Sequence, residues 1–160
     1  MNGKVKYIVH ASVIAALYAA LTILIAPISS GLMQCRISEA MCILPFFTPA
    51  AIPGLFVGCL LANLLTGAVI YDVIFGSLAT LLAAVGTYYL KKWGASKYLA
   101  PLPSVVLNAV IVGALLVYAY GVGVPYLVAA SYVAAGQAIA CYGLGIPLLI
   151  VLERYENKLF

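Results

Sequence analysis

Three ionisable residues, Arg36, Glu39 and Asp72, stand apart from the other charges of this chain, and long apolar stretches surround them. A carboxylate can accept hydrogen bonds from two N–H groups of a solute, and a guanidinium can donate to a carbonyl or an acid. Because ionisable residues within apolar spans are functional by default, we interpret the three as a candidate binding site. Purely structural roles remain open, since Glu39 could pair with Arg36 three residues away and Asp72 could cap a helix.

Other polar and aromatic residues are expected at the same level of the molecule. Asn63 and Gln137 fall within apolar stretches, and Asn108 lies nearer the opposite end of its stretch. The aromatic residues expected at the same level are Tyr71, Phe75, Tyr118, Tyr120 and Tyr126. A few convergent polar groups in an apolar, aromatic-lined concavity are typical of a small-molecule site. The alternatives are hydrogen bonds between helices for the amides and an interfacial belt for the aromatics.

The composition predicts an all-α integral membrane protein. Of the 160 residues, 66% are hydrophobic and 8% are charged, whereas about 25% of a soluble domain is charged. The net charge of +4 does not indicate nucleic-acid binding, because the basic residues flank apolar segments. The single histidine, His10, has no metal ligand near it in sequence, and no cysteines form a CxxC pair. We therefore predict no metal, no cofactor, no disulfide and no enzymatic activity.

Seven of the eight basic residues lie in three clusters, at positions 4–6, 91–97 and 154–158. Basic residues mark the cytoplasmic ends of membrane spans, so an even number of spans should separate consecutive clusters. A span needs roughly 20 apolar residues, and parity requires two spans within the Pro-rich region 37–70. We predict one domain over residues 1–160, with six transmembrane helices and both termini cytoplasmic. The predicted spans are 7–26, 37–48, 53–70, 72–90, 104–120 and 126–152.

The first predicted span carries Ala11, Ala15 and Ala19 at a spacing of four residues. This spacing puts three small side chains on one helix face, where another helix can approach closely. Packing within the chain is one interpretation, and docking of a partner is the other. The chain has no G-x-x-x-x-G-K-[ST] phosphate loop and no series of buried carboxylates for a proton relay. If it moves a solute against a gradient, it therefore needs a partner that supplies the energy.

Residues 34–80 carry a resemblance to a known family, which extends more loosely over 100–160. The matching segments are Gln34-Cys35-Arg36-Ile37-Ser38-Glu39-Ala40, Leu44-Pro45, residues 49–55, Gly58-Cys59, Ala62-Asn63 and residues 72–80. They resemble the queuosine-precursor transporter (QueT) family, whose members are substrate-binding S-components of energy-coupling-factor (ECF) transporters.

The resemblance implies a six-helix bundle in the cell membrane that captures its solute from outside, under a loop at 28–36. The implied solutes are 7-deazaguanine bases that precede queuosine, or queuine and queuosine. It also implies association with a transmembrane coupling subunit and two ATPase subunits through small residues of the first helix, here Ala11, Ala15 and Ala19. ATP hydrolysis would then topple the S-component so that its site faces inward.

The resemblance also suggests roles for individual residues. A guanine-like edge offers ring and exocyclic N–H donors, for which Glu39 is the first choice of acceptor and Asp72 the second. A ring carbonyl needs a donor, which Gln137, Gln34 or Asn63 could supply. Stacking on Tyr71 or Phe75 would contribute about 1–3 kcal/mol by analogy with nucleic-acid binders.

Two other functions are compatible with the sequence. The first is an S-component for another vitamin, such as riboflavin, thiamine or folate. The second is a structural membrane subunit that binds no small molecule. The second predicts that Glu39 and Arg36 only pair with each other, and that the outer cavity is absent or filled.

Overall fold

A computed structural model describes residues 3–25 and 36–159, and all secondary structure in this part of the chain is helical. This confirms the predicted all-α class. The elements are α1 (Gly3–Leu24), η1 (Ile37–Phe46), α3 (Ala51–Leu65), η2 (Asp72–Gly76), α4 (Ser77–Lys92), η3 (Lys97–Leu99), α5 (Leu102–Tyr118), α6 (Tyr126–Ala138), η4 (Ile139–Leu144) and α7 (Gly145–Leu159). Of these, η1 and η3 are 3₁₀ helices, whereas η2 and η4 are π-helical turns continuous with their neighbours.

Four helical runs in the described residues are long and apolar enough to cross a membrane. They are Gly3–Leu24, Asp72–Lys92, Lys97–Tyr118 and Tyr126–Tyr155. The other two predicted spans are shorter helices, of 10 residues in η1 and 15 in α3. The helix predicted to reach residue 70 ends at Leu65, because the chain turns at Gly67, which has a φ of 71°. Most of η1 is buried, as a short helix at membrane depth must be.

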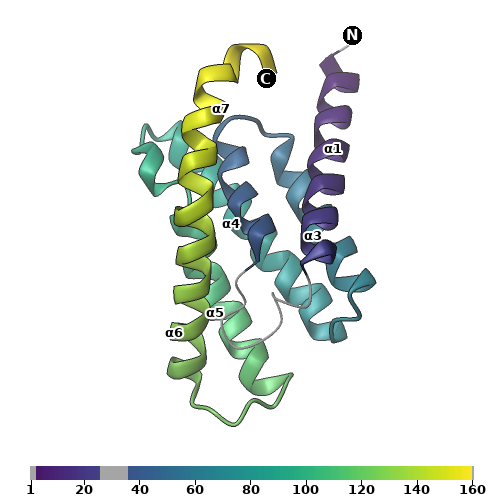
Figure 1. Ribbon diagram of the computed structural model, residues 1–160, viewed down its shortest axis with the longest axis vertical. Helices are drawn as coiled ribbons and strands as arrows, with labels where there is room; N and C mark the ends of the chain where they lie inside the picture. The colour runs from purple at the N-terminus through teal and green to yellow at the C-terminus, as the bar shows by residue number, and fades with distance from the viewer. Residues whose placement is uncertain (1–2, 26–35, 160) are drawn as a thin grey trace.

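The described ends of the chain lie at the same end of the molecule, where α1 begins and α7 finishes (Figure 1). An ion pair of 2.7 Å between Lys97 Nζ and Glu153 Oε2 places the turn between α4 and α5 beside α7. The three basic clusters therefore lie on one side, as the predicted parity requires. That this side is cytoplasmic remains a prediction.

Small residues join α1 tightly to α3. A Cβ atom at Gly54 would lie 2.8 Å from the main-chain oxygen of Ala11, and one at Gly58 would lie 2.8 Å from that of Ala15. Ala15 and Ala19 are buried, with 7% and 8% of their surface exposed. The alanine face predicted to dock a partner therefore packs largely inside this chain. Small residues at a spacing of four occur in both helices, as Ala11 and Ala15 in α1 and as Gly54 and Gly58 in α3, because this spacing lets the two helices approach closely.

The apolar core consists of two clusters of buried side chains. The larger includes Tyr18, Ile43, Leu55 and Leu149, and the smaller packs α5 against α6. Buried polar side chains line a void that touches both clusters, at Cys59 of the larger and at Val112 of the smaller.

Candidate functional site

The candidate site is built on segments that depart from α-helical geometry. Arg36 is the residue that precedes η1, Glu39 lies in the first turn of η1, and Asp72 begins η2. Gln137 lies two residues before the π-helical turn η4. Runs of 3₁₀ helix longer than 3–4 residues are uncommon, and π-helical turns occur frequently at functional sites. The irregular helical segments and the isolated charges are thus two independent observations that point to the same functional region.

Side chains from these segments enclose a small polar void. Its lining residues come from η1, α3, η2, α4, α5 and α6, and include Arg36, Glu39, Cys59, Asp72, Gly76, Thr80, Asn108, Val112 and Gln137. A second void shares Glu39 and Thr80 with the first and extends to Tyr18 and Ser104. Each has a volume of about 10 Å³, which holds at most one water molecule. The site is therefore contracted: this conformation has the filled cavity that the structural-subunit alternative predicts, and binding of a bicyclic solute requires the site to widen.

Glu39 is the centre of a hydrogen-bond chain that crosses the bundle. Its side chain is buried, and Tyr18 OH of α1 donates to Oε1 at 2.5 Å. Ser104 Oγ of α5 donates to Oε2 at 3.1 Å. Asn108 Nδ2 donates to Ser104 Oγ at 3.2 Å and to Gln137 Oε1 at 3.3 Å. This series of hydrogen bonds links α1, η1, α5 and α6 entirely through side-chain groups.

Asp72 is the centre of a second cluster at the other wall of the void. Its Oδ2 accepts a hydrogen bond of 2.9 Å from Tyr120 OH and lies 3.7 Å from Arg36 Nη2. Arg36 Nη1 donates to Asn63 Oδ1 at 3.0 Å, and Asn63 Nδ2 donates to the main-chain oxygen of Asp72 at 3.3 Å. With Glu39 included, one cation and two carboxylates line the void, so these groups carry a formal charge of −1.

The structure brings together six of the nine residues predicted to bind a solute: Arg36, Glu39, Asn63, Asp72, Asn108 and Gln137. Gln34, and residues 28–35 of the predicted lid at 28–36, lie outside the described residues. Asn108 belongs to the cluster although its place in the sequence suggested a weaker role. It shares a helix face with Ser104, four residues earlier.

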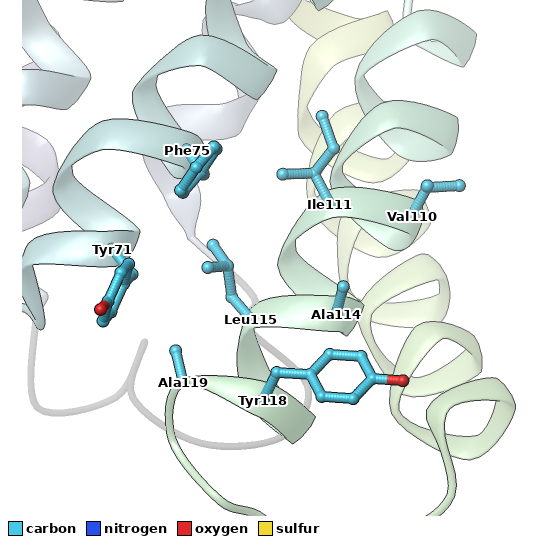
Figure 2. Close-up of a pocket in the computed structure, with 8 residues that line it drawn as sticks. All are labelled: Tyr71, Phe75, Val110, Ile111, Ala114, Leu115, Tyr118 and Ala119. Atoms are coloured by element: carbon cyan, nitrogen blue, oxygen red, sulfur yellow. The ribbon is translucent and has the colours of Figure 1, made fainter.

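Tyr71 and Phe75 do not line the polar void, contrary to the prediction. Their side chains are 55% and 47% exposed, and they line an apolar groove on the outer surface with a volume of about 520 Å³. Figure 2 shows them on one side of this groove, across from Leu115 and other side chains of α5. Asp72 and Gly76, the residues that follow each of them, face inward instead. In this conformation, therefore, neither Tyr71 nor Phe75 is placed to stack on a solute held in the void.

Sequence reasoning did not assign Tyr18, Thr80 or Ser104 to the site, and it named Tyr120 only among the aromatic residues at the same level. Tyr18 lies in a span that reads as apolar, Thr80 in the middle of another, and Ser104 at an expected helix start. Tyr120 reads as an interfacial aromatic. A usable signal was the four-residue spacing of Ser104 and Asn108, which puts two polar groups on one face of an apolar helix.

Comparison with known proteins gives one match. The model of a family described as "QueT transporter" matches residues 8–154, which is nearly the whole chain. No curated protein and no solved structure matches the sequence.

Proposed function

Because this chain belongs to the QueT transporter family, a family of membrane transporters of the queuosine-precursor type, we propose that it is the substrate-binding S-component of an ATP-driven ECF transporter. The observation that supports this most is the enclosure of Arg36, Glu39 and Asp72 around one void. Two buried carboxylates in an apolar bundle cost folding free energy, so their convergence calls for a ligand rather than for helix capping alone. A purely structural subunit would have little reason to retain them.

The proposed solutes are 7-deazaguanine bases, queuine or queuosine. Gln137 Nε2 and Asn108 Oδ1 form no hydrogen bond with the described residues, so one donor and one acceptor stand available in the void. The donor suits a ring carbonyl, and the Glu39 carboxylate suits the neighbouring ring and exocyclic N–H groups. The formal charge of −1 favours a solute with a protonated aminomethyl group over a neutral 7-cyano analogue.

Binding must exchange internal hydrogen bonds for contacts with the solute. Ser104 and Asn108 hold α5 against Glu39 and Gln137 in the contracted site. A bicyclic base is far larger than a void of about 10 Å³, so α5 and η1 separate when the solute enters. N–H groups of the solute then replace the donors that the carboxylates lose.

The proposed partners are a transmembrane coupling subunit and two ATPase subunits in the cell membrane. Ala15 and Ala19 pack against the rest of this chain, whereas Ser12, Ala16 and Ala20 are exposed on a neighbouring face of α1. These three have the same four-residue spacing that the alanine face was predicted to use. We therefore place the contact with the coupling subunit on Ser12, Ala16 and Ala20 in this conformation.

A binding panel tests the proposal directly. The purified protein in detergent is titrated calorimetrically with 7-aminomethyl-7-deazaguanine, 7-cyano-7-deazaguanine, queuine, riboflavin, thiamine and folate. Saturable binding of a deazaguanine, without binding of the three vitamins, is the expected result. Binding of a vitamin alone would assign the chain to that vitamin, and no binding of any compound would favour a structural subunit.

A further inference from the structure

The two oxygens of the Asp72 carboxylate have different surroundings. The residue is 2% exposed, and Oδ2 is held by the Tyr120 hydroxyl at 2.9 Å and the Arg36 guanidinium at 3.7 Å. No hydrogen bond from the described residues reaches Oδ1. Among the described residues only Ser77 Oγ is both fully enclosed and without a partner, so Oδ1 is not sealed in the protein, and Asp72 lines the void. Oδ1 is therefore an acceptor that the protein itself leaves open.

Gly76 provides the space in which Oδ1 lies. A Cβ atom at this position would be 2.6 Å from Asp72 Oδ1 and 3.4 Å from Asn63 Nδ2, and the first of these is closer than real Cβ contacts. The glycine has φ −64° and ψ −41°, ordinary right-handed helical values, so its backbone does not require glycine. Glycine inside a helix is less favourable than alanine, because it loses more conformational freedom on folding. The missing side chain at Gly76 is therefore explained by the carboxylate one turn earlier.

We propose that Gly76 is a specificity-determining position, because it lets Asp72 present Oδ1 to an N–H or ammonium group of the solute. Tyr120 and Arg36 fix Oδ2, so rotation of the carboxylate is restricted and only one acceptor is offered. This assignment rests on the proposed function. It adds that the contact between the solute and the Asp72 carboxylate depends on the absence of a side chain at Gly76.

A double-mutant cycle tests the assignment, with 7-aminomethyl-7-deazaguanine titrated calorimetrically into wild-type, Gly76→Ala, Asp72→Asn and the double variant. A hydrogen bond to a charged group corresponds to about 10- to 150-fold in affinity, so Gly76→Ala should raise Kd by that factor. The double variant should bind no worse than Asp72→Asn. In the Asn variant the carboxylate that the new alanine side chain would displace is already absent. Gly143→Ala is the matched control, since its Cβ would have nothing within 4 Å, and it should bind as wild type.

The outcomes separate the assignment from the proposed function. If wild-type protein binds the base and Gly76→Ala binds it equally well, the proposed role of Gly76 is refuted. It is also refuted if the losses of affinity in Gly76→Ala and Asp72→Asn multiply in the double variant. If wild type and Gly143→Ala both fail to bind any deazaguanine, the proposed function fails as well. Should Gly76→Ala not fold, Asp72→Asn decides, because loss of the charged acceptor should raise Kd by the same factor, and an unchanged Kd would overturn the assignment.

Discussion

Replacement of Glu39 by glutamine should weaken binding of the solute without unfolding the protein. The side chain is buried, and its two oxygens accept hydrogen bonds from Tyr18 and Ser104. Glutamine keeps the shape and one acceptor but puts an amide NH₂ where the second acceptor was. The two hydroxyls can rotate and accept from that amide, whereas the N–H groups of a guanine-like edge cannot.

The size of the effect follows from the charge on the acceptor. A hydrogen bond to a charged group is worth about 1.5–3 kcal/mol, which corresponds to a rise in Kd of about 10- to 150-fold. Burial of a charge is itself unfavourable, so its removal offsets part of the hydrogen bonding that the folded protein loses. The midpoint of thermal unfolding should therefore change much less than the affinity does.

Calorimetry is the suitable assay, because the single tryptophan, Trp93, is 77% exposed at the end of α4 and reports poorly on the void. Glu153→Gln is the matched control, with the same chemical change at a side chain that is 47% exposed and pairs with Lys97. Exposed ion pairs contribute about 0–1 kcal/mol, so this variant should bind as wild type. Equal affinity of Glu39→Gln and wild type would refute the role of Glu39, and an equal loss in both variants would show that the change acts through net charge.

Three further predictions concern packing, the hydrogen-bond chain and orientation. Gly58→Ala places a Cβ 2.8 Å from a main-chain oxygen of α1, so the free energy of unfolding should fall by about 1–3 kcal/mol, and an unchanged melting temperature would contradict the α1–α3 contact. Tyr18→Phe removes a donor to Glu39 and should lower that free energy by about 1–3 kcal/mol, whereas Tyr132→Phe, at a side chain 45% exposed, should have no effect. In a Cys35→Ser background, which removes the native cysteine of the predicted outer loop, a membrane-impermeant maleimide applied to intact cells should label a cysteine introduced at Gly123 but not one at Ala95. The reverse pattern would show that the predicted orientation is inverted.

The sequence was sufficient for the helical class and for most of the helix positions, because apolar length and proline positions are local properties. It placed the end of the third helix five residues too late, at 70 instead of Leu65. The turn at Gly67 depends on one glycine with positive φ in a stretch that is otherwise apolar, and hydropathy does not detect it. Whether η1 and α3 cross the membrane likewise depends on what covers them, which is a property of the whole bundle.

For the site, the isolated charges were identifiable from sequence because burial of a charge is costly and few positions tolerate it. The direction in which a neighbouring side chain points was not. The π-helical turn η2 directs Asp72 and Gly76 inward, and this leaves Tyr71 and Phe75 on the outer surface. The partner of a small-residue face is similarly undetermined, since a four-residue spacing does not specify which helix it will meet.

The network around the void implies that selectivity depends on hydrogen-bond donors more than on size. In the proposed opening of the site, Ser104 separates from Glu39, and a solute without N–H groups at that edge would leave a buried carboxylate short of donors. Sites built to hydrogen-bond a substrate group discriminate by 10⁴–10⁵ against analogues that lack it, far more than apolar pockets do against a methylene. A 7-deazaadenine, which lacks the ring N–H and the exocyclic amine of the guanine edge, should therefore bind far more weakly than the 7-deazaguanine of the same size. If the two bases bound equally, Glu39 and Asp72 would have to be structural residues and the solute would have to lie elsewhere.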